Sequence, residues 1–515
     1  MEVFRRRGLE PEIRTGMNGE ELVREVANVD ALIVRSATKI TRPVILAASE
    51  LRVIGRAGIG VDNIDCDAAT EQGVVVMNTP RGNATTTAEL AITLMLSLAR
   101  NITRADRRVR GGAWSKKGLV GTDITGKTLG IVGLGRIGRI VAERAQGLGM
   151  KVCAFDPYLD ANAGPTAIEL LSLEDLLARA DFVSLHVPLT PSTRHLLSWE
   201  RLARVKPGCR LINASRWGVV DEEAVLDALS EGRLRGAAFD VLEEEPPASD
   251  HPLLQRDDVI VTPHLGASSS EAQLRVAVDI AEQVADFLLD GVAQNAVNAP
   301  TLPPESMVEM APFLLLAEKL GSFLSQRMGG PLRKIELTVA GDVARFGVEH
   351  FRLALLSGVL RHTMDTGVNF VNASKLAKER GILVLENTSD EAVYRRGQIT
   401  ARGARRAGGA VQVVSGAVFG REPRIIEVDG VLLDLPVRGT MLVTRHRDEP
   451  GVIGLLGTLL GQHGVNIRRL DLAPPAPHSD GLSTGFLTLY GRPEDAVVGA
   501  IGEMEPIHEV QLLHL

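Results

Sequence analysis

Three stretches in the middle of the chain each place an ionisable side chain after an apolar run. NASRWGVVDEEAV (213–225) brings Arg216, DVLEEEPP (240–247) brings a run of glutamates, and PHLGASS (263–269) brings His264. In an open α/β sheet the ends of the parallel strands share one rim, and ligands bind there. The sequence therefore predicts that these side chains meet in one site.

An arginine, a carboxylate and a histidine together suit the interconversion of a 2-hydroxy acid and a 2-oxo acid. The planar guanidinium of Arg216 can hold a substrate carboxylate through two hydrogen bonds. His264 can move a proton at the oxygen near neutral pH while hydride moves at carbon. A carboxylate beside it would orient the ring and stabilise the imidazolium. We expect Glu245 to supply it, but spacing does not show which glutamate of Glu243–Glu245 faces the site, and the run also suits a solvated acidic surface.

The stretch GIVGLGRIGRIVAERAQGLGMKVCAFDP (130–157) predicts where the hydride carrier binds. Gly133, Gly135 and Gly138 form G-x-G-x-x-G, in which the glycines allow a tight turn, a close approach to pyrophosphate, and helix packing. The helix N-terminus that follows attracts phosphate. The next strand ends at Asp156, whose carboxylate can accept both ribose hydroxyls and would repel a 2′-phosphate, which favours NAD over NADP. Asp156 is alternatively a turn residue.

Composition narrows the class of protein. The chain has 515 residues, enough for roughly three to four domains. Its net charge of −7 gives no basic excess for nucleic acid or an anionic membrane. Cys66, Cys153 and Cys209 lie far apart, which argues against a disulfide framework and a zinc ribbon. No signal peptide or membrane-length apolar run is present in the sequence, so we expect a cytoplasmic protein.

The elements that must position these groups alternate along the first part of the chain. Buried strands are expected at 31–36, 51–58 and 74–79, and a helix at 88–100 that a threonine-rich start would cap. From Leu129 six short apolar runs follow, separated by helical or loop spacers: LGIVGLG, KVCAFD, FVSLHVP, RLINAS, AAFDVL and VIVTPH. Such a pattern predicts a parallel sheet covered on both faces.

The second half has a different organisation. The prolines of VNAPTLPPESM (297–307) indicate a linker. Residues 308–435 carry an arginine cluster that suits either a phosphorylated metabolite or a solvated basic face: Arg395, Arg396, Arg402, Arg405 and Arg406. From residue 438 to the end, the order strand, helix, strand, strand, helix, strand predicts a ferredoxin-like module.

Together these motifs resemble the D-isomer-specific 2-hydroxyacid dehydrogenases and, within them, the long-form D-3-phosphoglycerate dehydrogenases. VRSATKIT (34–41), GRAGIGVDNID (55–65) and GLGRIG (133–138) carry the resemblance, with the three stretches quoted first. It implies an α/β fold with a Rossmann-type doubly wound parallel sheet. The implied domains are a discontinuous flavodoxin-like substrate-binding domain (1–80 and 266–297), an NAD-binding domain (81–265), an α+β intervening domain of the allosteric substrate-binding type (301–435) and a ferredoxin-like ACT domain (439–515).

The resemblance also implies an activity. It is the NAD-dependent oxidation of 3-phospho-D-glycerate to 3-phosphohydroxypyruvate, the first step of phosphorylated L-serine biosynthesis, in a homotetramer or dimer that L-serine regulates. Arg216 would bind substrate, Glu245 would partner the histidine, and His264 would be the acid/base. Two alternatives remain: another dehydrogenase or reductase acting on glyoxylate, hydroxypyruvate or 2-oxoglutarate, or an NAD-sensing binding protein.

Further site residues follow from the same resemblance. The expected cofactor contacts are Gly133, Gly135, Arg136, Ile137, Gly138, Asp156, Val187, Ala214, Ser215, Asp240, Gly266 and Ala267. The expected substrate contacts are Arg35, Arg56, Ile59, Gly60 and Asn83, although either arginine alone also suits a surface ion pair. The expected regulatory residues are His446, Asp448 and Asn466, which are alternatively only turn residues.

Two departures from the family pattern stand out. Trp217 occupies a position where the family usually has glycine, and its indole either reshapes the pocket or packs under the loop. Family members usually have a strand and the start of a helix before the stretch that matches MEVFRRRG, so we expect this chain to begin inside the first helix. Either the start is misassigned or that strand is absent.

Overall fold

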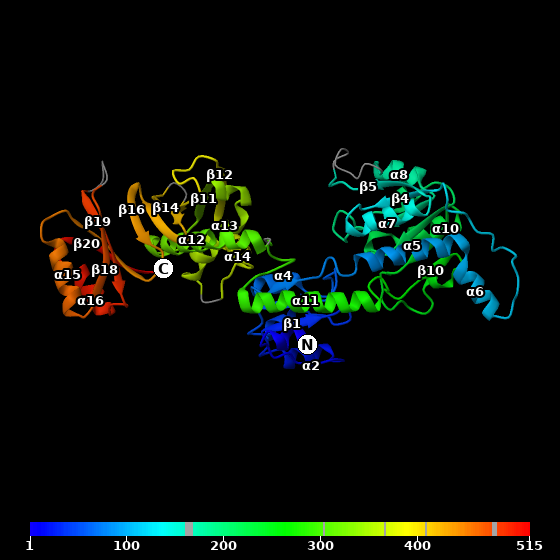
Figure 1. Ribbon diagram of the computed structural model, residues 1–515, viewed down its shortest axis with the longest axis horizontal. Coiled ribbons are helices and arrows are strands. Elements are labelled where there is room, and N and C mark those ends of the chain that lie inside the picture. The colour runs from blue at the N-terminus through cyan, green and yellow to red at the C-terminus, as the bar shows by residue number, and fades with distance from the viewer. Residues whose placement is uncertain (160–167, 302–303, 365–366, 407–408, 476–480) are drawn as a thin grey trace. The chain divides into compact units, whose positions relative to one another are not determined.

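The chain divides into two compact units. A computed structural model describes residues 1–159, 168–301, 304–364, 367–406, 409–475 and 481–515. One unit comprises residues 1–56, 61–78 and 281–515, and the other comprises residues 57–60 and 79–280. We call them the large unit and the Rossmann unit. Figure 1 labels their elements.

The Rossmann unit is built on a seven-stranded sheet in which every pair of neighbours is parallel. In spatial order its strands are β10 (Val259–Val261), β9 (Leu234–Phe239), β8 (Cys209–Asn213), β7 (Phe182–Leu185), β4 (Thr128–Val132), β5 (Lys151–Phe155) and β6 (Glu169–Leu170). The predicted doubly wound sheet is confirmed. The two-residue strand β6 was not predicted, because so short an element leaves no periodic signal.

Helices cover both faces of this sheet because its strands are apolar on both sides. Phe182 packs in one hydrophobic cluster with α5 and α7, and the next residue, Val183, packs in another with α8 and α10. The helices of the unit are α5 (Ala84–Arg100), α6 (Ile102–Arg110), α7 (Arg136–Gly147), α8 (Leu173–Arg179), α9 (Trp199–Leu202) and α10 (Glu222–Ser230), with 3₁₀ turns η1 (Trp217–Val219) and η2 (Pro252–Gln255). Figure 1 shows α7 and α8 on opposite sides of β4.

The start of α5 corrects the expectation of a threonine cap. The helix begins at Ala84, so the threonines lie inside its first turns, and the N-cap residue Asn83 makes no side-chain cap. The hydroxyl of Thr87 donates instead to the carbonyl oxygens of Asn83 (3.0 Å) and Gly266 (2.8 Å). A threonine inside a helix bonds back to the carbonyl four residues earlier, and here it also ties α5 to the loop after β10.

The large unit begins with a three-stranded parallel sheet, β1 (Ala31–Val34), β2 (Val53–Arg56) and β3 (Val75–Met77). Its helices are α1 (Glu2–Arg6), α2 (Gly19–Glu25), α3 (Arg42–Ala47) and α4 (Cys66–Glu71). The chain returns to this sheet after α11 (Ser270–Asp290), because Ala296 forms an antiparallel bridge with Met77 and the side chain of Asn298 accepts from the backbone N–H of Val76 (2.8 Å).

A second, six-stranded sheet follows, in the order β12 (Leu383–Ser389), β11 (Lys334–Ala340), β13 (Gln398–Ala404), β14 (Val411–Phe419), β15 (Glu422–Val428) and β16 (Val431–Pro436). It packs with α12 (Pro304–Met328), α13 (Glu349–Arg361), α14 (Ala373–Glu379) and the turn η3 (Asp342–Phe346). The predicted linker is therefore shorter than expected, since Pro304 already belongs to α12. Proline suits the first turn of a helix, where its missing N–H is not needed. Residues 302 and 303 of that linker lie outside the described part.

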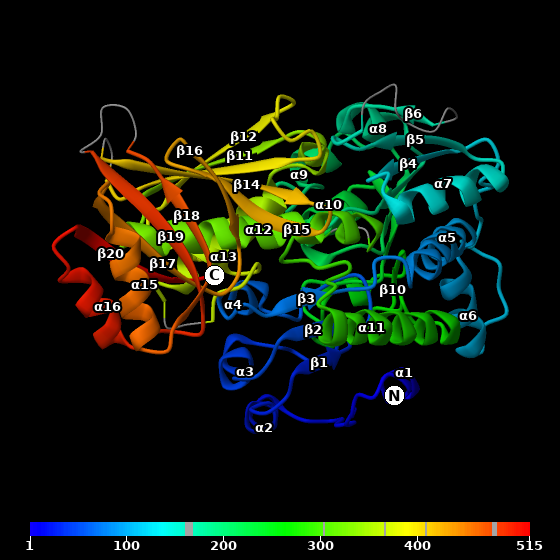
Figure 2. The ribbon, with the colours of Figure 1, turned by 60° about the vertical axis from the view of Figure 1, so that its left-hand side comes forward.

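The C-terminal module has the predicted ferredoxin-like order. Its elements are β17 (Thr440–Arg447), α15 (Val452–Gln462), β18 (Asn466–Ala473), β19 (Leu482–Tyr490), α16 (Asp495–Gly502) and β20 (Ile507–His514). The strands form an antiparallel sheet in the order β18-β19-β17-β20. Figure 2 shows α15 and α16 together on one face of it.

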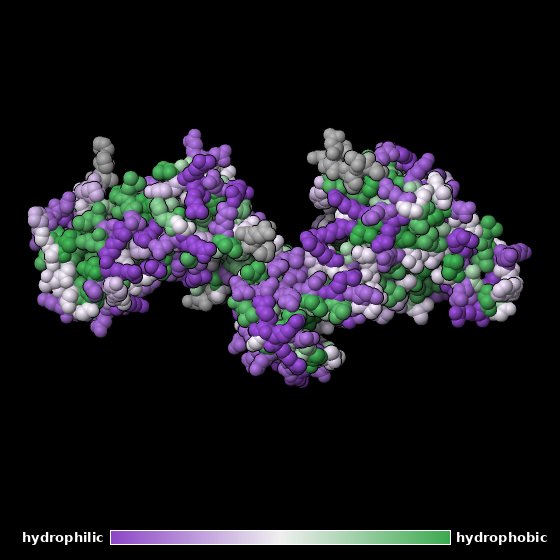
Figure 3. Space-filling model, in the orientation of Figure 1, coloured by the Kyte–Doolittle hydropathy of each residue, from purple (hydrophilic) through white to green (hydrophobic). Residues whose placement is uncertain are grey.

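Hydrophilic residues are spread over the face of the protein drawn in Figure 3. Among the described residues no helix has both the length and the apolar character to cross a membrane.

Close packing of α12 on α13 depends on two glycines, and this predicts a stability effect. A Cβ on Gly358 would collide with the carbonyl oxygen of Glu318, and one on Gly321 with that of Leu355. Gly358→Ala should therefore lower the free energy of unfolding by about 1–3 kcal/mol in urea titrations. Gly454→Ala, in α15 and facing open space, is the control and should be neutral or slightly stabilising. Equal stability of the wild type and Gly358→Ala would contradict the packing.

Candidate active site

A histidine and a glutamate from two neighbouring loops form a hydrogen-bonded pair. Nδ1 of His264, after β10, lies 2.9 Å from Oε2 of Glu245, after β9. The other oxygen, Oε1, accepts from the backbone N–H of Leu242 at 3.2 Å. This leaves Nε2 of His264 directed away from the glutamate. The structure thus places Glu245, rather than Glu243, against the histidine.

Asp240 fastens the two loops beneath this pair. It is 1% exposed and accepts hydrogen bonds from the Thr262 hydroxyl (2.6 Å) and from the backbone N–H groups of Leu265 (2.7 Å) and Gly266 (2.8 Å). Burial raises the pKa of Asp240, and these donors pull it back. His264 itself has a φ of +55°, a conformation uncommon for non-glycine residues, and its N–H donates to the carbonyl of Asp240. Asp240 therefore holds the backbone in the turn that aims the imidazole.

Arg216 lies on the loop after β8, and a buried asparagine shapes that loop. The side-chain amide of Asn213, which is 0% exposed, donates to the carbonyl of Arg216 (3.0 Å). Its oxygen accepts from the backbone N–H (3.1 Å) and the hydroxyl (2.8 Å) of Ser215. Because β8 and β9 are parallel neighbours, with Asn213 beside Phe239, these loops leave the sheet at the same edge. Trp217 packs against Arg194, whose guanidinium lies 5.7 Å from the centre of the indole, so Trp217 belongs to the packing of its loop.

The glycine-rich turn after β4 has the shape that a dinucleotide needs. Gly133 has a φ of +92°, and a Cβ there would meet the carbonyl oxygen of His186 at 2.6 Å and the side chain of Val187 at 2.7 Å. A Cβ on Gly138 would collide with the carbonyl of Gly133. Gly135 differs, because nothing lies within 4 Å of its Cβ position. The open space lies at the N-terminus of α7, where a pyrophosphate binds.

Both oxygens of Asp156 already accept backbone hydrogen bonds. Oδ2 accepts from Leu134 (2.9 Å) and Oδ1 from Tyr158 (3.0 Å). These bonds fix the carboxylate beside the glycine-rich turn, and each oxygen keeps a further lone pair for a ribose hydroxyl. Asp156 is therefore a turn residue that keeps acceptor capacity on both oxygens. Of the remaining expected contacts, Arg136 is exposed, while Ile137, Ser215 and Ala267 are half-buried and Ala214 and Gly266 buried.

The residues expected at the substrate phosphate fall in both units. In the large unit Arg56 ends β2 opposite Val34, and Arg35 follows Val34, so both arginines lie at the carboxyl edge of the three-stranded sheet. In the Rossmann unit Ile59 and Gly60 lie on a short loop, and Asn83 directly precedes α5. Oδ1 of Asn83 is buried without a hydrogen-bond partner in the described part of the chain, which suits a polar ligand.

The three expected regulatory residues do not meet in one module. His446 and Asp448 lie where β17 ends, opposite the start of β19 at Leu482. Asn466 begins β18 opposite Tyr490, where β19 ends. Eight residues of strand separate these ends, roughly 25 Å. Asp448 and Asn466 therefore do not lie side by side within one chain. His446 is also only 3% exposed.

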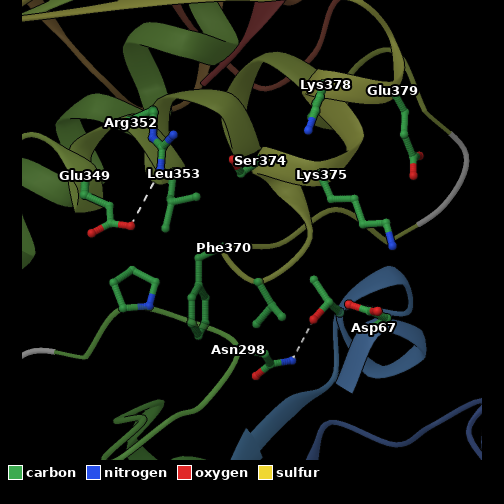
Figure 4. Close-up of a pocket in the computed structure, with 13 residues that line it drawn as sticks. Asp67, Asn298, Glu349, Arg352, Leu353, Phe370, Ser374, Lys375, Lys378 and Glu379 are labelled. Carbon is green, nitrogen blue, oxygen red and sulfur yellow. Dashed lines mark hydrogen bonds and ion pairs between the residues drawn. The ribbon is translucent and has the colours of Figure 1, made fainter. Parts of the chain in front are cut away.

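A pocket of about 780 Å³ lies between α4 and the helices α13 and α14 of the large unit. Figure 4 shows Arg352, Lys378 and Phe370 around it, with Lys375 near Asp67. Lys375 pairs with Glu71 of α4 at 2.7 Å. The sequence did not predict this pocket, because its lining comes from segments far apart in the chain. Arg402, one of the five clustered arginines noted in the sequence, does not line this pocket and pairs with Glu336 at 3.6 Å.

Sequence reasoning also missed the residues that support the site from behind. Asn213 and Thr262 act through short polar contacts that have no spacing signature. Asn213 opens the NASRWG stretch, so its place at the end of a buried strand was the one available signal. In the described part of the chain no group of three or more histidine, cysteine or carboxylate side chains could hold a metal ion.

Comparisons with known proteins agree with this geometry. Residues 92–266 match the profile of the D-isomer specific 2-hydroxyacid dehydrogenase, NAD binding domain, and residues 309–429 match that of the D-3-phosphoglycerate dehydrogenase intervening domain. The first match covers the glycine-rich turn, the loops of Arg216 and Glu245, and His264. NAD is therefore the cofactor of this site, in agreement with the open space at Gly135.

Individual relatives extend the match over nearly the whole chain. D-3-phosphoglycerate dehydrogenase of Methanocaldococcus jannaschii is 40% identical over 98% of this chain and 96% of its own length. Among solved structures, the TT0316 protein of Thermus thermophilus is 38% identical, with a TM-score of 0.53 over 57% of this chain and 95% of its own. An NAD-dependent formate dehydrogenase of Staphylococcus aureus, solved with NAD, is 29% identical, with a TM-score of 0.52 over 57% and 90%.

The glycine-rich turn yields a prediction in which stability and binding separate. In Gly135→Ala the added methyl group meets no protein atom, so the fold should be unchanged, but it projects where the pyrophosphate must approach. NAD should bind about tenfold more weakly or worse, measured by titration calorimetry. Gly147→Ala, at the far end of the same helix and equally open, should bind NAD normally. Unchanged affinity in Gly135→Ala would place the pyrophosphate elsewhere.

Proposed function

Because the chain belongs to the D-3-phosphoglycerate dehydrogenase family of D-isomer-specific 2-hydroxyacid dehydrogenases, we propose that it oxidises 3-phospho-D-glycerate to 3-phosphohydroxypyruvate with NAD. The reaction is the first step of the phosphorylated route to L-serine. The main structural support for this proposal is the 2.9 Å hydrogen bond between His264 and Glu245, which lies at the same sheet edge as the glycine-rich turn.

The proposed chemistry assigns one task to each polar side chain. Arg216 binds the substrate carboxylate through its planar guanidinium. Neutral His264 accepts the proton of the C2 hydroxyl at Nε2. Glu245 then stabilises the imidazolium through Nδ1 and keeps the ring oriented. NAD, when bound at the glycine-rich turn, would supply the acceptor for the hydride that leaves C2. Asp156 is proposed to accept the ribose hydroxyls, which favours NAD over NADP.

The phosphate of the substrate distinguishes this proposal from its nearest alternative. Arg35 and Arg56 lie at the same edge of the three-stranded sheet and are proposed to bind that dianion. Ile59, Gly60 and Asn83 are further proposed substrate contacts. A reductase of glyoxylate, hydroxypyruvate or 2-oxoglutarate would need no such cations. A purely NAD-sensing protein would not need the pairing of Glu245 with His264.

Regulation and assembly form a second part of the proposal. We propose that the C-terminal module is an ACT domain that binds L-serine between two chains. The opposite positions of Asp448 and Asn466 support this, because a site that uses both needs a second copy. Exposed apolar side chains also favour a homodimer or homotetramer, since Trp114 is 90% and Val120 78% exposed.

The proposed location is the cytoplasm. Free thiols at Cys66, Cys153 and Cys209 fit a reducing compartment. Burial raises the pKa of the Cys66 thiol to about 11 and that of Cys209 to about 12, so both stay protonated.

Replacement of the histidine tests the catalytic assignment. His264→Ala should lower kcat by about 10²–10⁴, because it removes the proposed acceptor of the hydroxyl proton. NADH binding, followed by fluorescence, should be unchanged. Rates are measured as NAD reduction with 3-phosphoglycerate at alkaline pH. Near-normal turnover would remove His264 from the chemistry.

The phosphate assignment predicts a change in selectivity. Arg35→Ala should raise KM for 3-phosphohydroxypyruvate in the reverse reaction by about tenfold, with a smaller effect on hydroxypyruvate, because one charge-assisted contact to phosphate is lost. Lys39→Ala, an exposed cation in the same segment, is the matched control. If Arg35→Ala changes both KM values equally, Arg35 does not read the phosphate.

A further inference from the structure

One largely buried carboxylate, that of Glu222, closes the loop that carries Glu245. Glu222 is the first residue of α10, and its Oε1 accepts the backbone N–H of Glu243 at 2.8 Å. Its Oε2 lies 3.2 Å from Nε2 of His251, eight residues further along the loop. The two oxygens of one side chain therefore hold both ends of the segment 243–251.

Both partners are withdrawn from solvent. The side chain of Glu222 is 11% exposed and that of His251 is 19% exposed. Burial raises the pKa of Glu222, while the N–H of Glu243 and the ring of His251 oppose that shift. Nδ1 of His251 is buried and has no partner among the described residues, so the tautomer with its proton on Nε2, donating to Glu222, satisfies the pair best. A paired, buried carboxylate is a firm anchor because breaking it leaves a polar group unsatisfied.

The two anchored ends of the loop lie on either side of Glu245, whose position must be fixed for it to pair with His264. Glu245 lies two residues after the first anchor, and its two oxygens meet the N–H of Leu242 and the ring of His264. The exposed fraction of its side chain is 39%, so packing alone does not fix it. A catalytic group displaced by about 1 Å can lose up to a hundredfold in rate. The position of Glu245 therefore depends on how firmly its loop is closed.

We infer that Glu222 and His251 are positioning residues for the reaction, which act by holding the loop of Glu245 at hydrogen-bonding distance from His264. The inference rests on the proposed roles of Glu245 and His264. Neither Glu222 nor His251 needs to touch substrate or cofactor. Their effect passes through the main chain between residues 243 and 251.

The test compares steady-state rates of NAD reduction with 3-phosphoglycerate over a range of pH. Glu222→Ala releases both ends of the loop, and His251→Ala releases only the end at residue 251. In both variants kcat should fall on the order of tenfold while KM for NAD is unchanged. The acidic limb of kcat/KM should move to lower pH, because a loosely held Glu245 favours the protonated imidazole less. A role in stability alone would not move that limb.

Rescue and control variants complete the design. Glu222→Gln should restore most of kcat, since the amide oxygen accepts from Glu243 and the amide N–H donates to the other tautomer of His251. Glu223→Ala, the exposed neighbour in the same turn, should behave as wild type. If Glu222→Ala does not fold, His251→Ala carries the test, because it leaves the start of α10 intact.

The outcomes separate this inference from the proposed function. Wild-type rates and an unmoved acidic limb in both alanine variants, with His264→Ala inactive, would overturn the positioning role of Glu222 and His251. The catalytic assignment of His264 would then still stand. A fall in kcat without movement of the limb would also overturn it. If His264→Ala stays active, the catalytic assignment itself fails, and the inference fails with it.

Discussion

The 2.9 Å hydrogen bond between Glu245 and His264 is the constraint on which the rest of the site depends. The two residues belong to different loops, so no local preference of the chain brings them together. Their distance is set by β9 and β10, which pair in parallel and send both loops from one edge of the sheet. Buried Asp240 then ties the two loops to each other.

The same edge explains how binding and proton transfer share one place. β4 ends in the glycine-rich turn and β8 ends in the loop of Arg216, so four parallel strands bring the glycine-rich turn, Arg216, Glu245 and His264 to one rim. Parallel pairing makes this automatic, because the carboxyl ends of all the strands coincide. The helices on both faces bury the apolar strand residues and keep the rim rigid.

Local patterns predicted the parts of this arrangement that are local. Short stretches of sequence were enough to predict the glycine-rich turn around Gly135, the buried strands of the seven-stranded sheet and the order of elements in the C-terminal module. Glu245 could not be separated from Glu243 by spacing, because the choice depends on how the loop is folded back by Glu222. The threonines could not serve as caps because α5 begins at Ala84 and contains them in its first turns.

Relations between segments far apart in the chain could not be predicted. Antiparallel pairing with β19 places His446 and Asp448 at one end of the sheet and Asn466 at the other. The pocket beside α14 likewise combines residues of α4 with residues from 298 to 379. Such relations depend on which strands and helices become neighbours, and a single sequence carries little information about that.

The most direct test of the account is the pH dependence of kcat/KM for 3-phosphoglycerate in Glu245→Gln. If Glu245 stabilises the imidazolium of His264, loss of its charge should lower the rate and move the acidic limb of the profile to lower pH, with NAD affinity unchanged. An acidic limb identical to that of the wild type would contradict the account, because the hydrogen bond at its centre would then have no part in the proton transfer.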